Sequence, residues 1–522
     1  METAIKRIYG NFSGVDFISE PSLVSINRSP DALNVWKNYS STQGSCIETR
    51  PGLMKMAKIG NEKVYEIHIF NKTTAIVHCG NQLVAWKNFP GEPAQENLEI
   101  IYDKMNKSKS SFYMFENKLY VKDGKNYLVY DGETIKTVDN TNPYIPTTTI
   151  GRNPSGGGEL YQDVNLLQPY RKNSFLADGK ATEYYLDSNN IDQDGEIKVF
   201  VNDVEVPNTD YQVNYTVGRI SFLEPPATPD LDGRDNVIIQ FKKTVEGYKE
   251  RIFNCTIAIV FDRRIFFSGN PEFPNAIFHS ELEDPSYISD LSYYQDGSDS
   301  SQIKSLTVGN NILWVFKDND QQNANIFYHI PTIDNEHGKI YPGKQGNVAT
   351  GCYGTSINFN DDIVFISRNG LEGISGDILS EQLLSHRSSL VDSKLTNTNN
   401  FSESVLVEWN GYLIILVDKY IFLADSRQKF QNMNSFEYEW YVWEFNNNPS
   451  IVKEYKNELY MGNDKGEIFK VSGTNDNGEG FISYWSTPMD NFGYNNMQKT
   501  TNKRRGNRVA SLITPETDCF CC

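Results

Sequence analysis

The chain has 522 residues and carries 67 acidic against 49 basic side chains, which gives a formal net charge of −18. This excess of carboxylates argues against a direct grip on nucleic-acid phosphates, because such binding depends on lysine and arginine. No stretch approaches the roughly 18 consecutive apolar residues of a membrane-spanning helix. Met1–Gly10 also lacks the apolar core of a signal peptide, so we expect neither membrane insertion nor a secretory leader.

Aromatic residues are abundant, with 30 Tyr and 29 Phe, and the runs that contain them are punctuated by Asn, Asp and Gly. This composition favours strands and tight turns over helices. The number of cysteines is odd, and the first four are far apart in the sequence, so a disulfide framework is not expected. Synthesis in a reducing cytoplasm fits the full set, which is Cys46, Cys79, Cys255, Cys352, Cys519, Cys521 and Cys522.

Seven segments share one pattern: an apolar strand, a polar turn and a second strand rich in Tyr, Phe, Leu or Ile. Asn117-Lys-Leu-Tyr-Val-Lys-Asp-Gly124 is a clear example, since alternation of period two between turn residues is the signature of a β-hairpin. The seven segments are Val64–Trp86, Phe112–Tyr130, Thr256–Phe278, Ser305–Tyr328, Ile357–Ile374, Val407–Leu423 and Lys453–Val471.

The segments start about 50 residues apart, and a β-rich repeat of that length is typical of a propeller blade. The sequence therefore predicts an all-β fold, a β-propeller of six or seven blades. A large irregular sandwich with chance spacing is the alternative. The helix signal is scarce, and the best candidate is Leu379–Leu395, where Leu379, Leu383, Leu390 and Lys394 recur at helical spacing.

One interval, from residue 112 to residue 256, exceeds the period and indicates an insertion after the second repeat. Its entry, Thr147–Gly158, is loop-like. Beyond it, five short alternating runs predict a small β-sandwich: Glu183–Leu186, Ile197–Val201, Tyr211–Val213, Arg219–Phe222 and Val237–Phe241. The predicted domains are an N-terminal extended arm (1–55), the propeller (56–165 and 246–475), the inserted sandwich (166–245) and a C-terminal segment (476–522).

No stretch of the sequence fully matches a known motif for phosphate, calcium or transition-metal binding. Gly156-Gly-Gly158 lacks the Gly-Lys-Ser/Thr ending of a phosphate-binding loop. Asn190, Asp192, Asp194 and Gly195 match the start of a calcium-binding loop, but its twelfth position is Val201, not Glu, so a plain hairpin turn explains them as well. The six histidines show no metal-ligand spacing. They are His68, His78, His279, His329, His337 and His386.

Paired carboxylates of the glycosidase kind can always be found among so many acidic residues, and neither a sialidase-type box nor a nucleophile elbow is present. We therefore expect no enzyme, and no catalytic, cofactor-binding or metal-binding residues. The C-terminus is unusual, because the basic stretch Lys499–Arg508 leads to Cys519-Phe-Cys-Cys522. We expect residues 504–522 to be a disordered end or the product of a frameshift.

Six stretches carry a resemblance when taken in order: Gly14-Val-Asp-Phe17, Arg28–Asn38, Glu48-Thr-Arg-Pro-Gly-Leu53, Phe267–Asn275, His386–Asp392 and Tyr484–Asn491. Together they resemble the packaged-DNA stabilisation or tail hub proteins of bacteriophage virions, over residues 10 to 503. Two departures stand out. Hub proteins of short-tailed phages lack the 183–241 insertion, and family members continue in further strands where the pattern here ends near Lys503.

The resemblance implies a non-enzymatic virion protein of the neck or tail, built as a ring of six identical subunits below the portal and its adaptor. Such a ring extends or plugs the DNA channel, stabilises packaged DNA and offers attachment for tail fibres, a spike or a needle. The negative charge fits a lumen that repels DNA, so that DNA contact is passive at most. The N-terminal arm either docks on a neighbouring subunit or packs on its own propeller.

Two other functions remain open from the sequence. One is a tail-associated adhesin that presents Tyr and Trp to host carbohydrates, although aromatic side chains in strands usually belong to the core. The other is a propeller enzyme that degrades polysaccharide. Propellers host all three functions, so the fold does not decide among them.

Overall fold

The computed structural model describes residues 11–39, 46–91, 95–229, 233–320, 322–335, 338–346, 350–374, 384–432 and 435–489. By its contacts the chain divides into two compact units. The first comprises Met1–Phe112 with Gly297–Cys522, and the second comprises Tyr113–Asp296. In the described part of the chain, no helix combines the length and the apolar character needed to cross a membrane.

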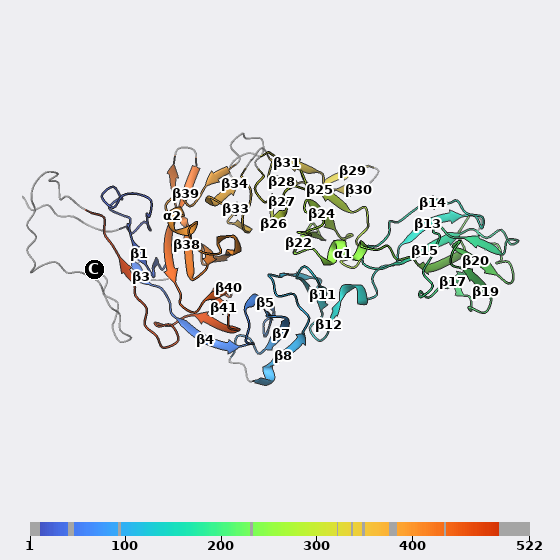
Figure 1. Cartoon of the computed structure of the whole chain (residues 1–522), viewed down its shortest axis with the longest axis horizontal. Coiled ribbons are helices and arrows are strands. Elements are labelled where there is room, and N and C mark those ends of the chain that lie inside the picture. Colours follow the sequence, from blue (N-terminus) through green and yellow to red (C-terminus); the bar gives the residue numbers. More distant parts are fainter. Residues whose placement is uncertain are drawn as a thin grey trace, which may run out of the picture. The chain divides into compact units, whose positions relative to one another are not determined.

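The repeated element is a four-stranded antiparallel sheet, which occurs seven times among the described residues, five times in the first unit and twice in the second (Figure 1). The sheets are β5 (Val64–Asn71), β6 (Thr74–Cys79), β7 (Gln82–Lys87) and β8 (Leu98–Tyr102); β9 (Ser111–Phe115), β10 (Lys118–Lys122), β11 (Tyr127–Tyr130) and β12 (Ile135–Thr137); β22 (Ile257–Phe261), β23 (Arg264–Ser268), β24 (Ala276–His279) and β25 (Tyr293–Gln295); β26 (Ile303–Gly309), β27 (Ile312–Lys317), β28 (Ile326–His329) and β31 (Gly343–Gln345); β32 (Ser356–Phe359), β33 (Asp362–Ser367), β34 (Gly370–Ile374) and β35 (Leu384–His386); β36 (Val405–Trp409), β37 (Tyr412–Val417), β38 (Tyr420–Asn432) and β39 (Ser435–Glu444); and β40 (Pro449–Tyr455), β41 (Glu458–Asn463) and β42 (Glu467–Val471) with β4 (Leu53–Lys58).

The fold is a β-propeller, and the seven predicted segments each supply the first three strands of one sheet. Within each unit the hydrophobic clusters draw side chains from two consecutive sheets. Trp314 and Phe316 of one sheet, for example, share a cluster with Ile363 and Phe365 of the next. Face-to-face packing of successive four-stranded sheets is what distinguishes a propeller from an irregular sandwich.

A recurrent tight turn explains why asparagine is so common. In six of the seven sheets the first two strands are joined through two consecutive residues with φ between 47° and 73°. Such a pair is the mark of a type I′ turn, which matches the twist of the flanking strands and favours Asn, Asp and Gly. The pairs are Glu116–Asn117, Asp262–Arg263, Asn310–Asn311, Asn360–Asp361, Asn410–Gly411 and Lys456–Asn457.

The last sheet takes its outer strand from the opposite end of the chain. Strand β4 pairs antiparallel with β42, with Leu53 opposite Val471 and Met54 opposite Lys470. Leu53 is buried in a cluster with Trp443 and Phe469, while Met54 points outward. The N- and C-terminal parts of the first unit are thus joined by backbone hydrogen bonds of a single sheet.

The insertion is a sandwich of a six-stranded and a three-stranded sheet that share one hydrophobic cluster, in which Phe175 and Val199 meet Tyr184 and Ile220. All five predicted short strands are present. The larger sheet contains β13 (Thr147–Arg152), β14 (Glu159–Leu160), β15 (Tyr170–Phe175), β17 (Lys198–Val201), β18 (Val204–Glu205) and β21 (Val237–Lys242), and the smaller one contains β16 (Glu183–Tyr185), β19 (Tyr211–Asn214) and β20 (Arg219–Phe222).

Two expectations were wrong. The stretch Thr147–Gly158 is not simply a loop, because Thr147–Arg152 forms β13 and pairs with β15, so the insertion begins earlier than residue 166. Leu379–Leu395 is not a helix: Leu384–His386 form β35, and only Asp392–Leu395 are helical (α2). Leu390 and Leu395 are buried in a cluster between two sheets, and this packing, not helical periodicity, explains their apolar character. Residues 375–383 lie outside the described part.

The remaining elements are short. They are the strands β1 (Ala32–Leu33), β2 (Val35–Lys37), β3 (Ile47–Thr49), β29 (Thr332–Asp334), β30 (Gly338–Ile340) and β43 (Tyr484–Trp485), the helix α1 (Tyr248–Phe253), and the 3₁₀ turns η1 (Gln95–Asn97), η2 (Val138–Asn140) and η3 (Phe401–Glu403).

The pairing of β4 with β42 can be tested with two neighbouring positions. Leu53→Ala should lower the free energy of unfolding of the first unit by about 2–5 kcal/mol, because it opens a cavity between packed sheets. Met54→Ala, on the solvent side of the same strand, should change it by no more than about 0.5 kcal/mol. Chemical denaturation measures both, and equal effects would contradict the register.

Candidate functional site

Five of the six stretches that carry the resemblance, far apart in the sequence, gather against strand β39 in the first unit. We call this assembly the terminal platform and define it as residues 11–37, 47–53, 384–395 and 476–489 with β39. Strands β1 and β2 lie on β39. The sixth stretch, Phe267–Asn275, lies in the second unit, where the Asn270 amide donates to the carbonyl oxygens of Glu250 and Arg251.

The first contact is made by the backbone of the arm. The Val15 N–H donates to the Trp440 carbonyl oxygen at 2.9 Å, and the Phe17 N–H donates to that of Leu390 at 2.8 Å. Gly14 has φ +82°, and a Cβ there would lie 2.5 Å from the Trp440 oxygen. The glycine is therefore required both by its conformation and by the close approach of two backbones.

Asn34 fastens the second part of the arm through its backbone and its side chain. Its N–H donates to the Val442 carbonyl oxygen at 2.8 Å, and its Oδ1 accepts from the Glu444 N–H at 2.7 Å. Its Nδ2 donates to the Ile482 carbonyl oxygen at 2.7 Å. A single buried amide thus connects the arm, β39 and the C-terminal segment.

Arg50 is the charged centre of the platform. Its side chain is fully buried, and Nη1 and Nη2 donate to the two carboxylate oxygens of Asp476 at 2.9 and 2.6 Å. Nε donates to Asn34 Oδ1 and Nη2 to the Glu444 carbonyl oxygen, both at 2.9 Å. Burial lowers the pKa of Arg50, and the hydrogen bond and charge of Asp476 oppose that shift.

The guanidinium plane also lies between two aromatic rings, 4.0 Å from the centroid of Phe445 and 3.7 Å from that of Phe481. Arginine suits this place because its planar fork can pair with a carboxylate and stack on rings at the same time. The hydrogen bonds to Asp476 and the contact with Phe481 both fix the C-terminal segment to the arm.

The chain ends meet again at a short sheet. Ala32 of β1 is opposite Trp485 of β43, and Leu33 is opposite Tyr484. Ser29 Oγ donates to the Ser486 carbonyl oxygen at 2.7 Å. The described arm therefore packs on its own propeller, which is one of the two alternatives left open by the sequence.

The segment that follows β35 is fixed by a second buried arginine. Arg387 is 1% exposed; Nε donates to Asp362 Oδ2 at 2.9 Å and Nη2 to Oδ1 at 3.2 Å. Its guanidinium lies 3.8 Å from the Phe436 ring centroid, and the Tyr438 hydroxyl donates to Asp362 at 2.6 Å. Arg387 thereby links β33 to β39, and the carboxylate of Asp362 neutralises the charge of its buried guanidinium.

His386 lies between two carboxylates. Nδ1 is 2.9 Å from Glu372 Oε1 and Nε2 is 2.6 Å from Asp392 Oδ2. Burial by itself would lower the pKa of His386, but the hydrogen bonds and charges of Asp392 and Glu372 outweigh it and raise the pKa to about 10. The imidazole is therefore a cation at neutral pH, and it ties α2 to β34.

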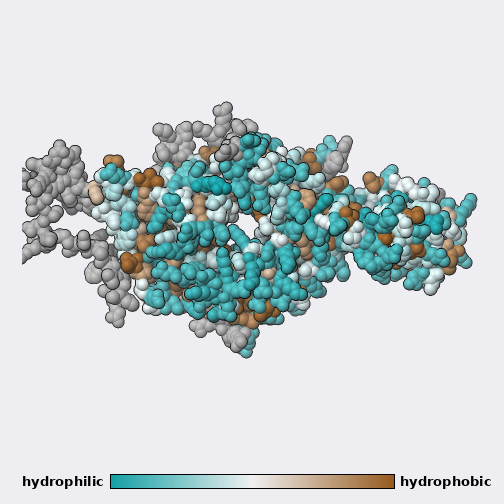
Figure 2. All heavy atoms as spheres, viewed as in Figure 1, coloured by the Kyte–Doolittle hydropathy of each residue, from teal (hydrophilic) through white to brown (hydrophobic). Residues whose placement is uncertain are grey.

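The outer face of the platform is apolar in places, and Figure 2 shows brown atoms at the end of the first unit where β1 and β3 are labelled in Figure 1. Leu23 is 76% exposed and Met489 is 72% exposed. The Met489 N–H donates to the Pro21 carbonyl oxygen at 3.0 Å, so these side chains belong to neighbouring segments. The other exposed apolar residues are Ile18, Ile26 and Ile482.

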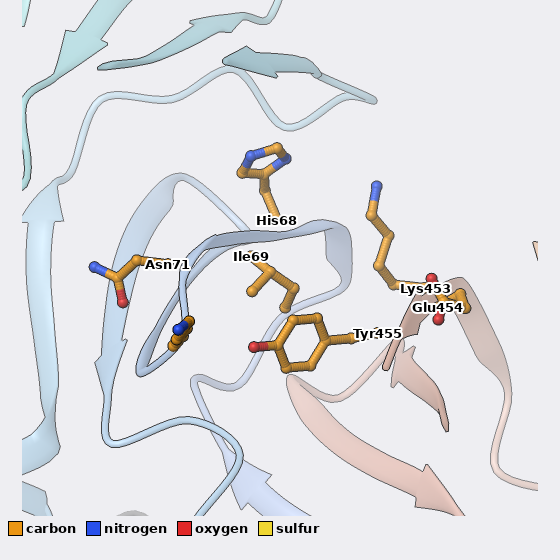
Figure 3. Close-up of a pocket in the computed structure, with 7 residues that line it drawn as sticks. His68, Ile69, Asn71, Lys453, Glu454 and Tyr455 are labelled. Atoms are coloured by element: carbon orange, nitrogen blue, oxygen red, sulfur yellow. The ribbon is translucent and has the colours of Figure 1, made fainter. Parts of the chain in front are cut away.

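A cavity of about 400 Å³ lies between β5 and β40 in the first unit (Figure 3). His68, Ile69, Lys72, Lys453 and Tyr455 are among the residues that line it. His68 Nε2 is buried without a hydrogen-bond partner, and burial, reinforced by the charge of Lys453, lowers the pKa of His68 to about 4. The pocket thus presents an uncharged imidazole, two ammonium groups and the carboxylate of Glu454.

The residues weighed as a calcium loop are used within the insertion. Asp194 accepts from Lys242 Nζ at 2.6 Å, and Asp192 accepts from the backbone N–H of Thr244 at 2.9 Å. Both carboxylates are used by contacts with Lys242 and Thr244, and the turn does not join a hairpin, because β16 and β17 belong to different sheets. No group of three or more His, Cys, Asp or Glu side chains that could hold a metal ion is found among the residues described.

The other residues singled out from the sequence occupy turns and the core. Gly156, Gly157 and Gly158 all have positive φ, and Arg152 donates to the Gly157 carbonyl oxygen at 2.7 Å. His78, His279 and His329 are buried and bonded to neighbouring side-chain or carbonyl oxygens. Cys79, Cys255 and Cys352 are buried free thiols, and Cys46 is half-buried. His337, Lys499–Arg508 and the last three cysteines lie outside the described residues.

Sequence reasoning quoted the stretches that contain Asn34, Arg50 and Arg387 but missed what these side chains do, and it assigned no role to Asp476 or Asp362. Asn34 has φ +58°, a conformation that Asn tolerates, so an Asn between two short strands was an available signal. Asp476 and Asp362 gave no such signal in the sequence, because they are separated from their arginine partners by 426 and 25 residues, respectively.

No family model and no curated protein matches the chain. Among solved structures it is similar to YCF48 bound to D1 peptide, at 6% identity over 82% of this chain and 96% of that one, with a TM-score of 0.36. It is also similar to BamB from Moraxella catarrhalis (10% identity, 80% and 99% covered, TM-score 0.36) and to the computationally designed Ika8 protein (9%, 80% and 99%, TM-score 0.33). TM-scores this low carry no functional argument, and the fold assignment rests on the seven sheets.

Mutation can test whether Arg50 holds the arm and the C-terminal segment together. Arg50→Ala should lower the free energy of unfolding of the first unit by about 3–5 kcal/mol, because it leaves the carboxylate of Asp476 and several acceptors without a partner. Lys107→Ala, which removes an exposed ion pair with Glu62, should cost no more than about 1 kcal/mol. Limited proteolysis should also cleave the C-terminal segment faster in the Arg50 variant only.

The two histidines should respond to pH with opposite signs. The pKa of His386 lies above its value in the unfolded chain, so its contribution to stability is complete below about pH 6.5 and is lost as the pH rises toward 10. The pKa of His68 lies below, so its contribution is complete above about pH 6.5 and is lost as the pH falls toward 4. NMR titration of the two imidazoles checks this, and midpoints near 6.5 for both would contradict it.

Proposed function

We propose that this chain is a structural protein of a bacteriophage virion, a component of the neck or tail hub that extends or plugs the DNA channel below the portal. The observation that carries the proposal is the terminal platform. Five of the stretches that resemble packaged-DNA stabilisation and tail hub proteins come from three distant parts of the sequence (14–53, 386–392 and 484–491), yet they come together around Arg50, Asn34 and strand β39.

Such convergence supports the resemblance, because unrelated stretches that match by chance have no reason to share one buried network. Ser29 of the second stretch bonds to Ser486 of the last, and Leu390 of the fifth accepts from Phe17 of the first. The stretches act as a unit that fixes the described arm and residues 476–489 to the propeller.

The partner that this platform suits is a second copy of the same chain. The buried arginines Arg50 and Arg387 lie on the inner side of the platform. Exposed apolar side chains, among them Leu23 and Met489, lie on its outer side. Exposed apolar groups beside a rigid, hydrogen-bonded scaffold are typical of protein–protein contacts. In the proposed ring each subunit places its terminal platform against a neighbour, and portal, adaptor, fibre or needle proteins bind the assembled ring.

The charge supports a passive relation to DNA. With a formal net charge of −18, the assembled ring would repel the duplex instead of holding it, so that DNA could slide during packaging and ejection. The proposed protein is synthesised in the host cytoplasm and ends in the virion.

Antibody labelling of purified virions tests this function directly. An antibody raised against the inserted sandwich, residues 147–242, should place gold at the junction of head and tail. Label at the distal tip would favour the adhesin alternative. Virions without label, for an antibody that detects the denatured chain, would overturn the proposal.

The use of the platform as a contact between copies needs its own test. Leu23→Asp combined with Met489→Asp should weaken self-association by at least about tenfold, because two charges enter an apolar contact. Ile333→Asp is the matched control, since that residue is 82% exposed on β29, outside the platform. Analytical ultracentrifugation measures the distribution of oligomers, and equal behaviour of the variants would contradict this role.

A further inference from the structure

The insertion carries a pocket of its own, of about 660 Å³, at an open side of the sandwich. The strand orders place β18 at one edge of the six-stranded sheet and β19 at one edge of the three-stranded sheet. Residues on or beside these edge strands line the pocket. Those that matter here are Glu196, Glu205, Pro207, Asn208, Tyr211 and Tyr215.

A buried tyrosine belongs to the apolar part of the lining. Tyr211 is only 8% exposed, and its hydroxyl donates to the Ile197 carbonyl oxygen at 3.0 Å. Burial raises its pKa, and the nearby Glu205, Tyr215 and Glu196 raise it further.

The pocket is acidic and has spare hydrogen-bonding capacity. Glu196 Oε2 is 3.5 Å from Lys198 Nζ, so its charge is partly compensated. Glu205 is exposed and, among the residues the structure describes, has no ion pair or side-chain hydrogen bond. The lining contains no lysine, arginine or histidine. A ligand that enters therefore meets one compensated and one uncompensated carboxylate beside two phenol rings.

We propose that this pocket binds an arginine or lysine side chain presented by an extended segment of a partner protein. The cation would pair with the Glu205 carboxylate and lie against the ring of Tyr215, which combines a charge-assisted hydrogen bond with a cation–π contact. The Asn208 amide would bond to the backbone of the same segment.

The position between two edge strands favours an extended segment. On its outer side neither β18 nor β19 pairs with another strand in the described chain, so backbone groups of a peptide could continue either sheet. A neutral carbohydrate could use the tyrosines and the carboxylates, but it would leave the charge of Glu205 uncompensated. The charge therefore favours the basic peptide. This inference concerns the insertion alone and stands whether or not the chain belongs to a virion.

Titration of the full chain with a short synthetic peptide tests the site. The probe has one arginine flanked by threonines and valines, and its twin carries glutamine in place of that arginine. At low ionic strength the arginine peptide should bind at least about tenfold more tightly than the glutamine peptide, and its affinity should fall as salt is added.

Two variants locate the binding. Glu205→Gln should weaken binding of the arginine peptide by about tenfold, since it removes the charge with little change of shape. Glu159→Gln makes the same chemical change on β14, the opposite edge strand of the same sheet, and should leave binding unchanged. Both positions are exposed, so both variants should fold, which circular dichroism checks.

Three results would overturn the proposal. One is equal affinity for the two peptides, and another is equal affinity of the two variants for the arginine peptide. The third is a neutral oligosaccharide that binds and competes with the peptide while Glu205→Gln has no effect, which would assign the pocket to carbohydrate.

Discussion

The buried guanidinium of Arg50 is the interaction on which the arrangement of the chain ends depends. It is fully enclosed and could not remain charged there without the carboxylate of Asp476, the amide of Asn34 and the carbonyl of Glu444. Those partners come from the C-terminal segment, the arm and β39. The contacts of this one side chain therefore hold the arm and the segment around Asp476 against β39, and β4, which begins three residues after Arg50, continues directly into the last blade.

Local sequence patterns were enough to predict the strands that are joined by short turns. The first three strands of every blade follow from period-two alternation around an Asn- or Asp-containing turn, and the five short strands of the insertion follow from the same rule. Several outer strands were harder to recognise because they have only three residues, as β12, β25, β31 and β35 do, and β4 comes from a distant part of the chain. Thr147–Arg152 was missed because three consecutive threonines followed by Ile, Gly and Arg show no alternation.

The site was only partly visible for the same reason. The stretches around Asn34, Arg50 and Arg387 could be quoted as a resemblance, but their association depends on pairs such as Arg50 and Asp476, which no spacing rule connects. The helix predicted at Leu379–Leu395 shows how a local pattern can also mislead. Leu390 and Leu395 belong to a core shared by two sheets, so tertiary packing, and not local helix propensity, determines their place.

A propeller whose ends are locked together and whose second repeat is followed by an independent sandwich has two separate surfaces to offer. The terminal platform offers apolar side chains on a rigid base, and the insertion offers an acidic pocket between edge strands. The first suits a permanent contact with a copy of the chain, and the second suits a contact that responds to salt. An electron cryomicroscopy reconstruction of the neck and tail of the purified virion tests the central claim most directly. It should show copies of this propeller in a ring, with Leu23 and Met489 at the contact between neighbours; a virion without the propeller, or a ring in which that face meets solvent, would contradict it.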